Sequence, residues 1–275
     1  MEKFLIIGGD KRQKILYDLL KSEGKDVSHM TETDTHIISS YSHIILPVPI
    51  SKDGRSIYCS DSGFCLSLND IADELIKSQT VFGGGFNEKF RSALQRKEIT
   101  CLDFMADEDF VTANAYLTAQ GALRLLLENT QEYIVSKKML IIGFGRVAKA
   151  LAAMLKSVGA DIYIAARNPS QLKLAELCSY KTFQLNEMGS YLCEFSYIFG
   201  TVPFNVLTED NIKLIRDDCV YFELASAPFT ADRNDFDRFG KRHIPGGALP
   251  GNFLPVASGR LLCDYILRST SDFGE

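Results

Sequence analysis

Residues 139–167 carry the most informative pattern of the chain, MLIIGFGRVAKALAAMLKSVGADIYIAAR. The short apolar run at 139–142 predicts a buried parallel strand. A G-x-G-x-x-A pattern follows, and apolar residues then recur at helical spacing up to Gly159, a glycine suited to the end of a helix. A second β-prone run covers 162–165. The order strand, tight turn, helix, strand is the context in which this pattern indicates a dinucleotide-binding site.

Each small residue of the G-x-G-x-x-A pattern has a physical task. Gly143 lets the chain leave the strand sharply, Gly145 lets a pyrophosphate approach bare backbone amides, and Ala148 lets the helix lie close to the strands. The phosphates would then meet free N–H groups and the positive end of the helix dipole. The alternative is a glycine turn in an α/β layer that binds no ligand.

The end of the second strand indicates which dinucleotide is bound. Sites that prefer NAD usually carry Asp or Glu there, to accept a hydrogen bond from the ribose 2′-hydroxyl. Residues 166–170 read ARNPS and contain no carboxylate. The Arg167 guanidinium can grip a 2′-phosphate through charge-assisted hydrogen bonds, and Asn168 or Ser170 can add a donor. We therefore expect NADP; the alternative is that Arg167 is a solvated surface arginine.

Composition limits the classes of protein to consider. The length of 275 residues allows about two domains. The net charge of −5 gives no basic footprint for nucleic acid. There is no apolar run of transmembrane length and no signal-peptide core, so we expect a cytoplasmic protein that binds no membrane. The seven cysteines and four histidines show no metal-ligand spacing, so we expect reduced thiols and no metal.

The residues before the long helix predict a second α/β layer. A strand at 3–7, a Gly-Gly-Asp turn and a helix at 11–22 open the chain. Further strands are expected at 43–46, 80–82 and 99–102 and helices at 69–77 and 87–96, with a loop or irregular hairpin at 51–64. This alternation favours a parallel sheet. Asp10, Lys11, Arg12 and Gln13 crowd the first turn of the first helix, either near a ligand or as a solvated cap.

The fold class that follows is α/β, with two Rossmann-like doubly wound parallel-sheet domains joined by a long helix and a cleft between them. We expect an N-terminal substrate domain at 1–130, completed by a C-terminal helix in 252–275, and a dinucleotide-binding domain at 131–251. The long helix, at 109–129, would be capped by Asp107 or Asp109.

One face of that long helix is polar and small. Asn114, Thr118 and Gly121 share it at i, i+4 and i+7. A glycine inside a helix costs about 1 kcal/mol relative to alanine, so Gly121 indicates close packing against another segment. We expect this face to line the cleft; the alternative is a stripe that faces solvent.

Two later strands, at 195–199 and 220–224, end in segments that should border the nicotinamide pocket. The first is followed by Thr201-Val202-Pro203 and the second by Ala225. Glu223, within the second strand, is expected to be structural rather than catalytic. A turn-rich loop at 245–252 and a closing helix at 254–267 complete the chain.

Several short motifs in one order resemble the dipicolinate synthase A-subunit family of endospore-forming bacteria. They run nearly from end to end and comprise GGDKRQ at 8–13, ILPV at 45–48, the three residues of the helix face, GFGR at 143–146, AR at 166–167, TVP at 201–203, LAS at 224–226 and PGGALPG at 245–251. The chain departs from the family pattern in carrying Leu117 for Pro, Gln120 for Glu, Glu223 for Asp and Ala227 for Arg.

The resemblance implies an NADP-dependent oxidoreductase that oxidises a dihydrodipicolinate-type intermediate to dipicolinate (pyridine-2,6-dicarboxylate) during sporulation. It also implies that the chain works with a flavoprotein-like B subunit, in the mother-cell cytoplasm and as a homo-oligomer. Formation of an aromatic ring supplies driving force, so positioning should matter more than a strong base. No His or Lys in the matching motifs stands out as a general base.

Together, pattern and resemblance assign two sets of site residues. The substrate carboxylates would bind Arg12, Gln13, Asn114 and Thr118. The cofactor would contact Gly143, Phe144, Gly145, Arg146, Val147, Ala166, Arg167, Asn168, Thr201, Val202, Pro203, Leu224 and Ala225.

Two other functions remain open. The chain could be an NADP-binding regulatory or scaffolding subunit without turnover of its own, which Gln120 and Ala227 favour. It could also be a related NADP-dependent dehydrogenase of another small carboxylate. The catalytic pairs typical of shikimate and 2-hydroxyacid dehydrogenases are missing, which argues against the second alternative.

Overall fold

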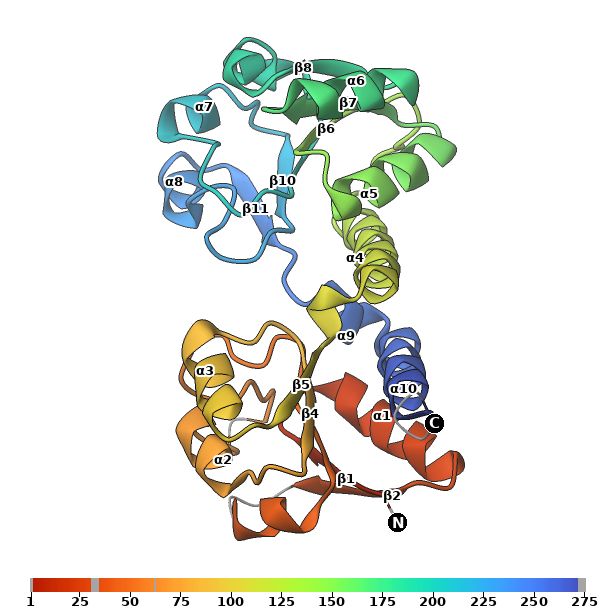
Figure 1. Ribbon diagram of the computed structural model, residues 1–275. Coiled ribbons are helices and arrows are strands. Elements are labelled where there is room, and N and C mark those ends of the chain that lie inside the picture. The colour runs from red at the N-terminus through yellow and green to blue at the C-terminus, as the bar shows by residue number, and fades with distance from the viewer. Residues whose placement is uncertain (1, 31–34, 62, 272–275) are drawn as a thin grey trace. The chain divides into compact units, whose positions relative to one another are not determined.

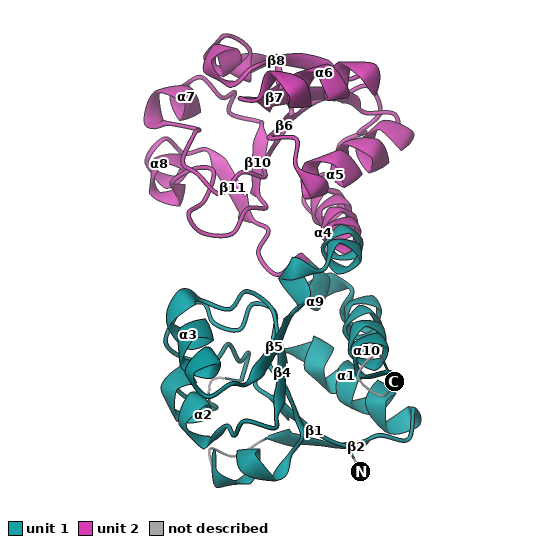
Figure 2. Ribbon diagram, in the orientation of Figure 1, with its two compact units in different colours: residues 1–114, 250–275 teal, residues 115–249 magenta. Residues whose placement is uncertain are grey.

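The computed structural model describes residues 2–30, 35–61 and 63–271 of the chain. They form two compact units, one from residues 1–114 and 250–275 and the other from 115–249 (Figure 2). Each unit is built on a parallel sheet. The predicted α/β class with two Rossmann-like sheets is confirmed.

The sheet of the first unit has the order β2-β1-β3-β4-β5, with every pair parallel. Its strands are β1 Lys3–Ile7, β2 Asp26–Met30, β3 His43–Ile45, β4 Thr80–Gly83 and β5 Thr100–Asp103. Side chains alternate between its faces, so Leu5 and Ile7 enter one core cluster while Phe4 and Ile6 enter another. Both faces of the sheet are therefore buried.

Helices cover both faces of this sheet. They are α1 Lys11–Ser22, α2 Leu68–Glu74, α3 Glu88–Arg96 and α10 Pro255–Ser271, with 3-10 turns η1 Thr35–Ser40 and η2 Phe104–Ala106. In Figure 1, α2 and α3 lie on one side and α1 and α10 on the other. Helix α10 closes the second core cluster with Leu262 and Ile266, which pack with Leu16 and Leu20 of α1.

The sheet of the second unit has the order β11-β10-β9-β6-β7-β8, again all parallel. Its strands are β6 Lys138–Ile142, β7 Asp161–Ala166, β8 Lys181–Gln184, β9 Tyr197–Gly200, β10 Val220–Glu223 and β11 Arg242–Pro245. Numbered within the unit, this is the order 3-2-1-4-5-6 of dinucleotide-binding folds. The strand that carries the G-x-G-x-x-A pattern is therefore central.

The remaining helices are short apart from α4 and α5. They are α4 Glu108–Glu128, α5 Arg146–Ser157, α6 Pro169–Leu177, α7 Glu209–Lys213, α8 Arg233–Arg238 and α9 Leu249–Phe253, with 3-10 turns η3 Leu185–Ser190 and η4 Leu192–Glu194. No helix in the described part of the chain is long and apolar enough to cross a membrane.

Helix α4 contains one division between the units, between residues 114 and 115, and α9 contains the other, between 249 and 250. The boundaries expected from the sequence are 130/131 and 251/252. The structure instead assigns the second half of α4 to the second unit.

A Cβ on Gly121 of α4 would lie only 2.8 Å from Cβ of Leu249, so the predicted close packing at this glycine is confirmed. Asp107 caps the helix, because its carboxylate accepts from Phe110 N at 2.7 Å.

Candidate functional site

The turn after β6 has the backbone that its sequence predicts. Gly143 has φ +99°, a conformation that L side chains rarely adopt. A Cβ there would lie 2.6 Å from Val202 Cγ1 and 2.7 Å from Thr201 Oγ1. The Thr201 hydroxyl donates to the carbonyl of Ile142 at 2.7 Å, so the ends of β6 and β9 are fixed together at this turn.

Gly145 leaves the start of α5 open. It is the N-cap of the helix, no side chain caps it, and a Cβ at this position would have nothing within 4 Å. The first-turn N–H groups of a helix have no partner inside the helix and carry the positive end of its dipole. Ala148 is fully buried, so the helix lies close to the sheet. This geometry fits the pyrophosphate of a dinucleotide.

Neighbouring predicted cofactor residues differ in what they offer. Phe144 is buried, with its ring 6.0 Å from the Tyr180 ring, so it would contact a cofactor through its backbone. Arg167 follows β7, is exposed, and has no ion pair within the described residues. Asn168 is the N-cap of α6: its side-chain oxygen accepts from Ser170 N at 2.9 Å. The Asn168 side chain is therefore already used as a cap, whereas the exposed Arg167 guanidinium remains available within the described residues.

The segments after β9 and β10, at 201–207 and 225–231, are hydrogen-bonded to each other. The Thr230 hydroxyl donates to Val202 O at 2.8 Å. The amides of Val206 and Leu207 donate to Thr230 O at 3.0 and 3.1 Å. In dinucleotide-binding folds with this strand order, the segments after the two corresponding strands flank the nicotinamide.

Glu223 holds the second segment from inside the unit. Its side chain accepts from Tyr221 OH at 2.8 Å, from Ala225 N at 3.0 Å and from Ala231 N at 3.2 Å. The residue is only 4% exposed. Burial raises the pKa of Glu223, and these hydrogen bonds oppose the rise. The predicted cofactor residues Leu224 and Ala225 follow directly, and Leu224 N donates to Gly200 O at 2.9 Å.

In the first unit, Arg12 is held by the chain itself. Its guanidinium donates to both carboxylate oxygens of Asp10, Nε to Oδ1 at 2.9 Å and Nη2 to Oδ2 at 2.8 Å, and Nη2 also donates to Val48 O at 2.6 Å. Arg12 is 6% exposed. Burial of Asp10 raises its pKa, but the hydrogen bonds and charge of Arg12 outweigh this, and the pKa lies below its usual value. The sequence predicts Arg12 as a substrate-binding cation, but it does not predict the ion pair with Asp10.

Gln13 completes the start of α1. Its Oε1 accepts from Asp10 N at 2.8 Å while Asp10 caps Arg12 N, a reciprocal capping box. Gln13 is fully buried, and its Nε2 has no hydrogen-bond partner among the residues that the structure describes. The loop that follows β3 covers this turn, since Gly9 N donates to Tyr58 O at 2.7 Å and Ser60 N to Gly9 O at 2.7 Å. The structure thus brings Arg12 and Gln13 together at the carboxyl end of β1, where Arg12 is paired with Asp10 and Gln13 Oε1 accepts from Asp10 N.

Asn114 and Thr118 lie one turn apart on α4, and both are half-buried. The division between the units falls between them. Their contact with a substrate stays a prediction.

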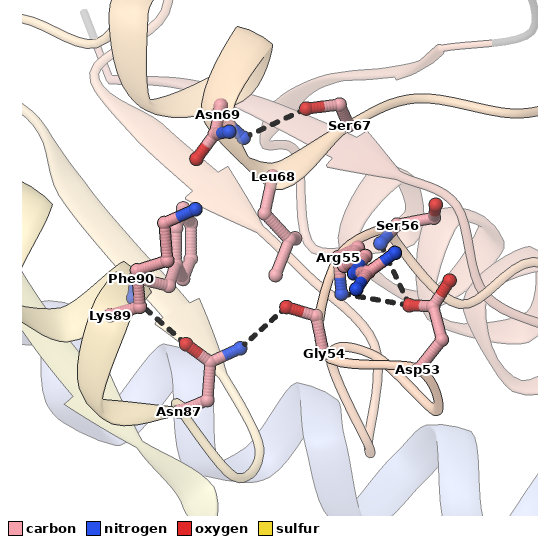
Figure 3. Close-up of a pocket in the computed structure, with 10 residues that line it drawn as sticks. All are labelled: Asp53, Gly54, Arg55, Ser56, Ser67, Leu68, Asn69, Asn87, Lys89 and Phe90. Carbon is pink, nitrogen blue, oxygen red and sulfur yellow. Dashed lines mark hydrogen bonds between the residues drawn. The ribbon is translucent and has the colours of Figure 1, made fainter.

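Two cavities are lined by residues that no sequence motif assigned to a site. One, of about 380 Å³ in the first unit, is lined by residues of the loop at 53–56 and of the starts of α2 and α3 (Figure 3). Asn87 bridges that loop and α3: its amide donates to Gly54 O at 3.1 Å and its oxygen accepts from Phe90 N at 2.8 Å. The other, of about 620 Å³, lies at the amino ends of β9, β10 and β11. The described residues include no cluster of three or more His, Cys, Asp or Glu that could hold a metal ion.

Comparisons with known proteins identify similar chains. The family model of the N-terminal domain of the dipicolinate synthase A subunit matches residues 3–105. The dipicolinate synthase A subunit of Bacillus subtilis (strain 168) is 20% identical over 279 residues, which span 96% of this chain and 94% of that protein. The crystal structure of the dipicolinate synthase A subunit from Bacillus halodurans has a TM-score of 0.83 at 22% identity, with 97% of each chain covered.

The same two-unit fold occurs in dehydrogenases. D-lactate dehydrogenase from Escherichia coli has a TM-score of 0.64 at 13% identity, covering 99% of this chain and 98% of that one. At this identity the likeness concerns the fold alone.

Proposed function

We propose that the chain is a member of the dipicolinate synthase A-subunit family, an NADP-dependent oxidoreductase subunit that oxidises a dihydrodipicolinate-type compound to dipicolinate; the similarities to that family over residues 3–105 and over nearly the whole chain support this. In this reaction the substrate ring would lose a hydride and a proton and become aromatic. When bound, NADP⁺ supplies the hydride acceptor.

One observation carries the proposal: the open start of α5 at Gly145, directly after the central strand β6 of the second sheet. The amides of residues 143–147 would bind the pyrophosphate. Arg167, which is exposed at the end of β7, would bind the 2′-phosphate and so select NADP over NAD. The segments at 201–207 and 225–231 would flank the nicotinamide.

The substrate carries two carboxylates and needs several donors. We retain Arg12, Gln13, Asn114 and Thr118 as the proposed set. Because Asp10 already accepts both edge donors of the Arg12 fork, a substrate carboxylate would have to displace Asp10 or use the remaining Nη1. By family, we also propose that the partner is a flavoprotein-like B subunit, that the chain is homo-oligomeric, and that it works in the mother cell of a sporulating bacterium.

A second candidate is an NADP-binding subunit without turnover of its own. The neutralised state of Arg12 favours it, since the first unit then offers a dicarboxylate less positive charge than the sequence indicates.

The test is to mix the purified chain with NADP⁺ and freshly generated dihydrodipicolinate, and to follow NADPH and dipicolinate absorbance together. Formation of both in equal amounts, beyond the rate without protein, supports the oxidoreductase. Tight NADPH binding with no product, with or without a B subunit, would instead favour the second candidate. Absence of NADPH binding would overturn both.

A further inference from the structure

The buried carboxylate of Glu223 sits where two segments of the second unit meet. Its two oxygens have different donors: Oε1 accepts from Ala225 N, and Oε2 accepts from Ala231 N and from the Tyr221 hydroxyl. Ala225 and Ala231 are the two ends of the segment that follows β10. One side chain therefore closes this segment into a loop.

Thr230 extends the same arrangement to the segment after β9. Its hydroxyl and its carbonyl bind the 201–207 segment, and residues 207 and 231 form a parallel bridge. A Cβ on Gly200, at the end of β9, would collide with the Tyr221 hydroxyl and would lie 2.8 Å from the Thr230 side chain. The bonds that reach the two segments thus come from Glu223 and Thr230, which hold the segments at one spacing.

The arrangement needs two acceptor oxygens. Backbone N–H groups can only donate, and the two from this loop reach different oxygens of Glu223. A glutamine offers one oxygen and one NH₂ group, so one loop end would face another donor. An aspartate keeps both oxygens but is shorter by one methylene, so from the same backbone its oxygens would lie farther from the two loop ends.

We propose that Glu223 is a positioning residue for the nicotinamide half of the cofactor, because it fixes the spacing of the segments at 201–207 and 225–231 that flank that half. The inference rests on the proposed dinucleotide site. It concerns only the half of the site on the β9 and β10 side of the central strand. The adenine half, on the β7 side, lies outside the network.

This division suggests the experiment, which compares two ligands on the full-length chain. NADPH occupies both halves of the site, whereas adenosine 2′,5′-bisphosphate occupies only the adenine half. Binding of each is measured by calorimetry, and the fluorescence of bound NADPH reports the surroundings of its nicotinamide. The variants are Glu223→Gln and Glu223→Asp, with Tyr221→Phe as the control that leaves both loop ends bound.

We expect Glu223→Gln to weaken NADPH binding about tenfold or more, the effect of one unsatisfied donor. The affinity for adenosine 2′,5′-bisphosphate should stay at the wild-type value, and the nicotinamide fluorescence should change. Glu223→Asp should act in the same direction, and Tyr221→Phe should leave both affinities nearly unchanged. Thr230→Val, which removes the hydroxyl bond to Val202 O and keeps the backbone bonds of residue 230, serves if the Glu223 variants do not fold, and should also affect NADPH alone.

Three outcomes would contradict the inference. Equal losses for both ligands would make Glu223 a general stabiliser of the unit. A lower melting temperature with both affinities unchanged would make its role purely structural. If the wild-type chain binds neither ligand, the proposed function itself fails, and that result is distinct from the other two.

Discussion

Replacing Arg12 by alanine separates a structural role of this residue from a role in substrate binding. The guanidinium makes three hydrogen bonds inside the first unit, two to Asp10 and one to Val48 O. Removing one partner of a buried ion pair costs about 3–5 kcal/mol, because the other charge stays buried. For a domain of this size that corresponds to a fall in Tm of roughly 6–20 °C.

The assay is thermal and urea unfolding of the full chain, with amide exchange in α1 to identify the unit that is affected. A double-mutant cycle isolates the pair: Arg12→Ala combined with Asp10→Asn should lose much less than the sum of the single variants, since no uncompensated charge remains. Arg12→Lys should recover only part of the stability, because an ammonium cannot match both carboxylate oxygens.

The ion pair also predicts a pH dependence. The pKa of Asp10 is lower in the folded chain than in the unfolded one, so this group stabilises the fold above the ordinary aspartate value of about 3.9. That contribution is lost as pH falls through the lowered pKa, and the stability difference between wild type and Arg12→Ala should shrink there. Normal stability of Arg12→Ala with lost dihydrodipicolinate turnover would refute this reasoning, and would make Arg12 a free substrate cation.

Three further changes test the second unit. Gly145→Val should abolish NADPH binding with a native melting transition, because its side chain would fill the space beside the start of α5; unchanged affinity would exclude a phosphate turn there. Arg167→Ala should reduce the preference for NADPH over NADH by roughly ten- to a hundredfold, as expected for one charge-assisted contact of about 1.5–3 kcal/mol. An equal preference in wild type and variant would count against Arg167. Gly121→Ala should destabilise the unit by about 1–3 kcal/mol through overpacking against Leu249, as judged by urea unfolding.

The elements that the sequence predicts well are those in the sheet interiors. Strands β1, β3, β4, β6 and β9 are apolar runs, and their predicted bounds agree with the structure to within about two residues. The missed strands β2, β8 and β11 are all at sheet edges. Their sequences are DVSHM, KTFQ and RHIP. A strand with one neighbour can carry polar residues on its open side, so these segments lack the apolar run by which the interior strands are recognised.

The candidate site divides in the same way. The phosphate turn is local, so its backbone follows from Gly143 and Gly145 alone. The role of Asn168 as a helix cap was also readable, since Asn-Pro at the start of a helix is a capping signal. The engagement of Arg12 was not readable, because it depends on Val48 at the end of a different strand.

The sequential layout of the two units has a consequence for how the chain folds during synthesis. The second unit is one uninterrupted segment, residues 115–249, inserted between the two segments of the first. Ribosomes deliver roughly 5–20 residues per second, and domains fold as their last residues emerge. The inserted unit can therefore fold while the enclosing one still lacks α10. Until that helix arrives, Leu16, Leu20 and Phe4 have no cover from Leu262 and Ile266. The nascent chain thus exposes an apolar surface on its incomplete first unit for several seconds. A chaperone would bind the chain in this interval.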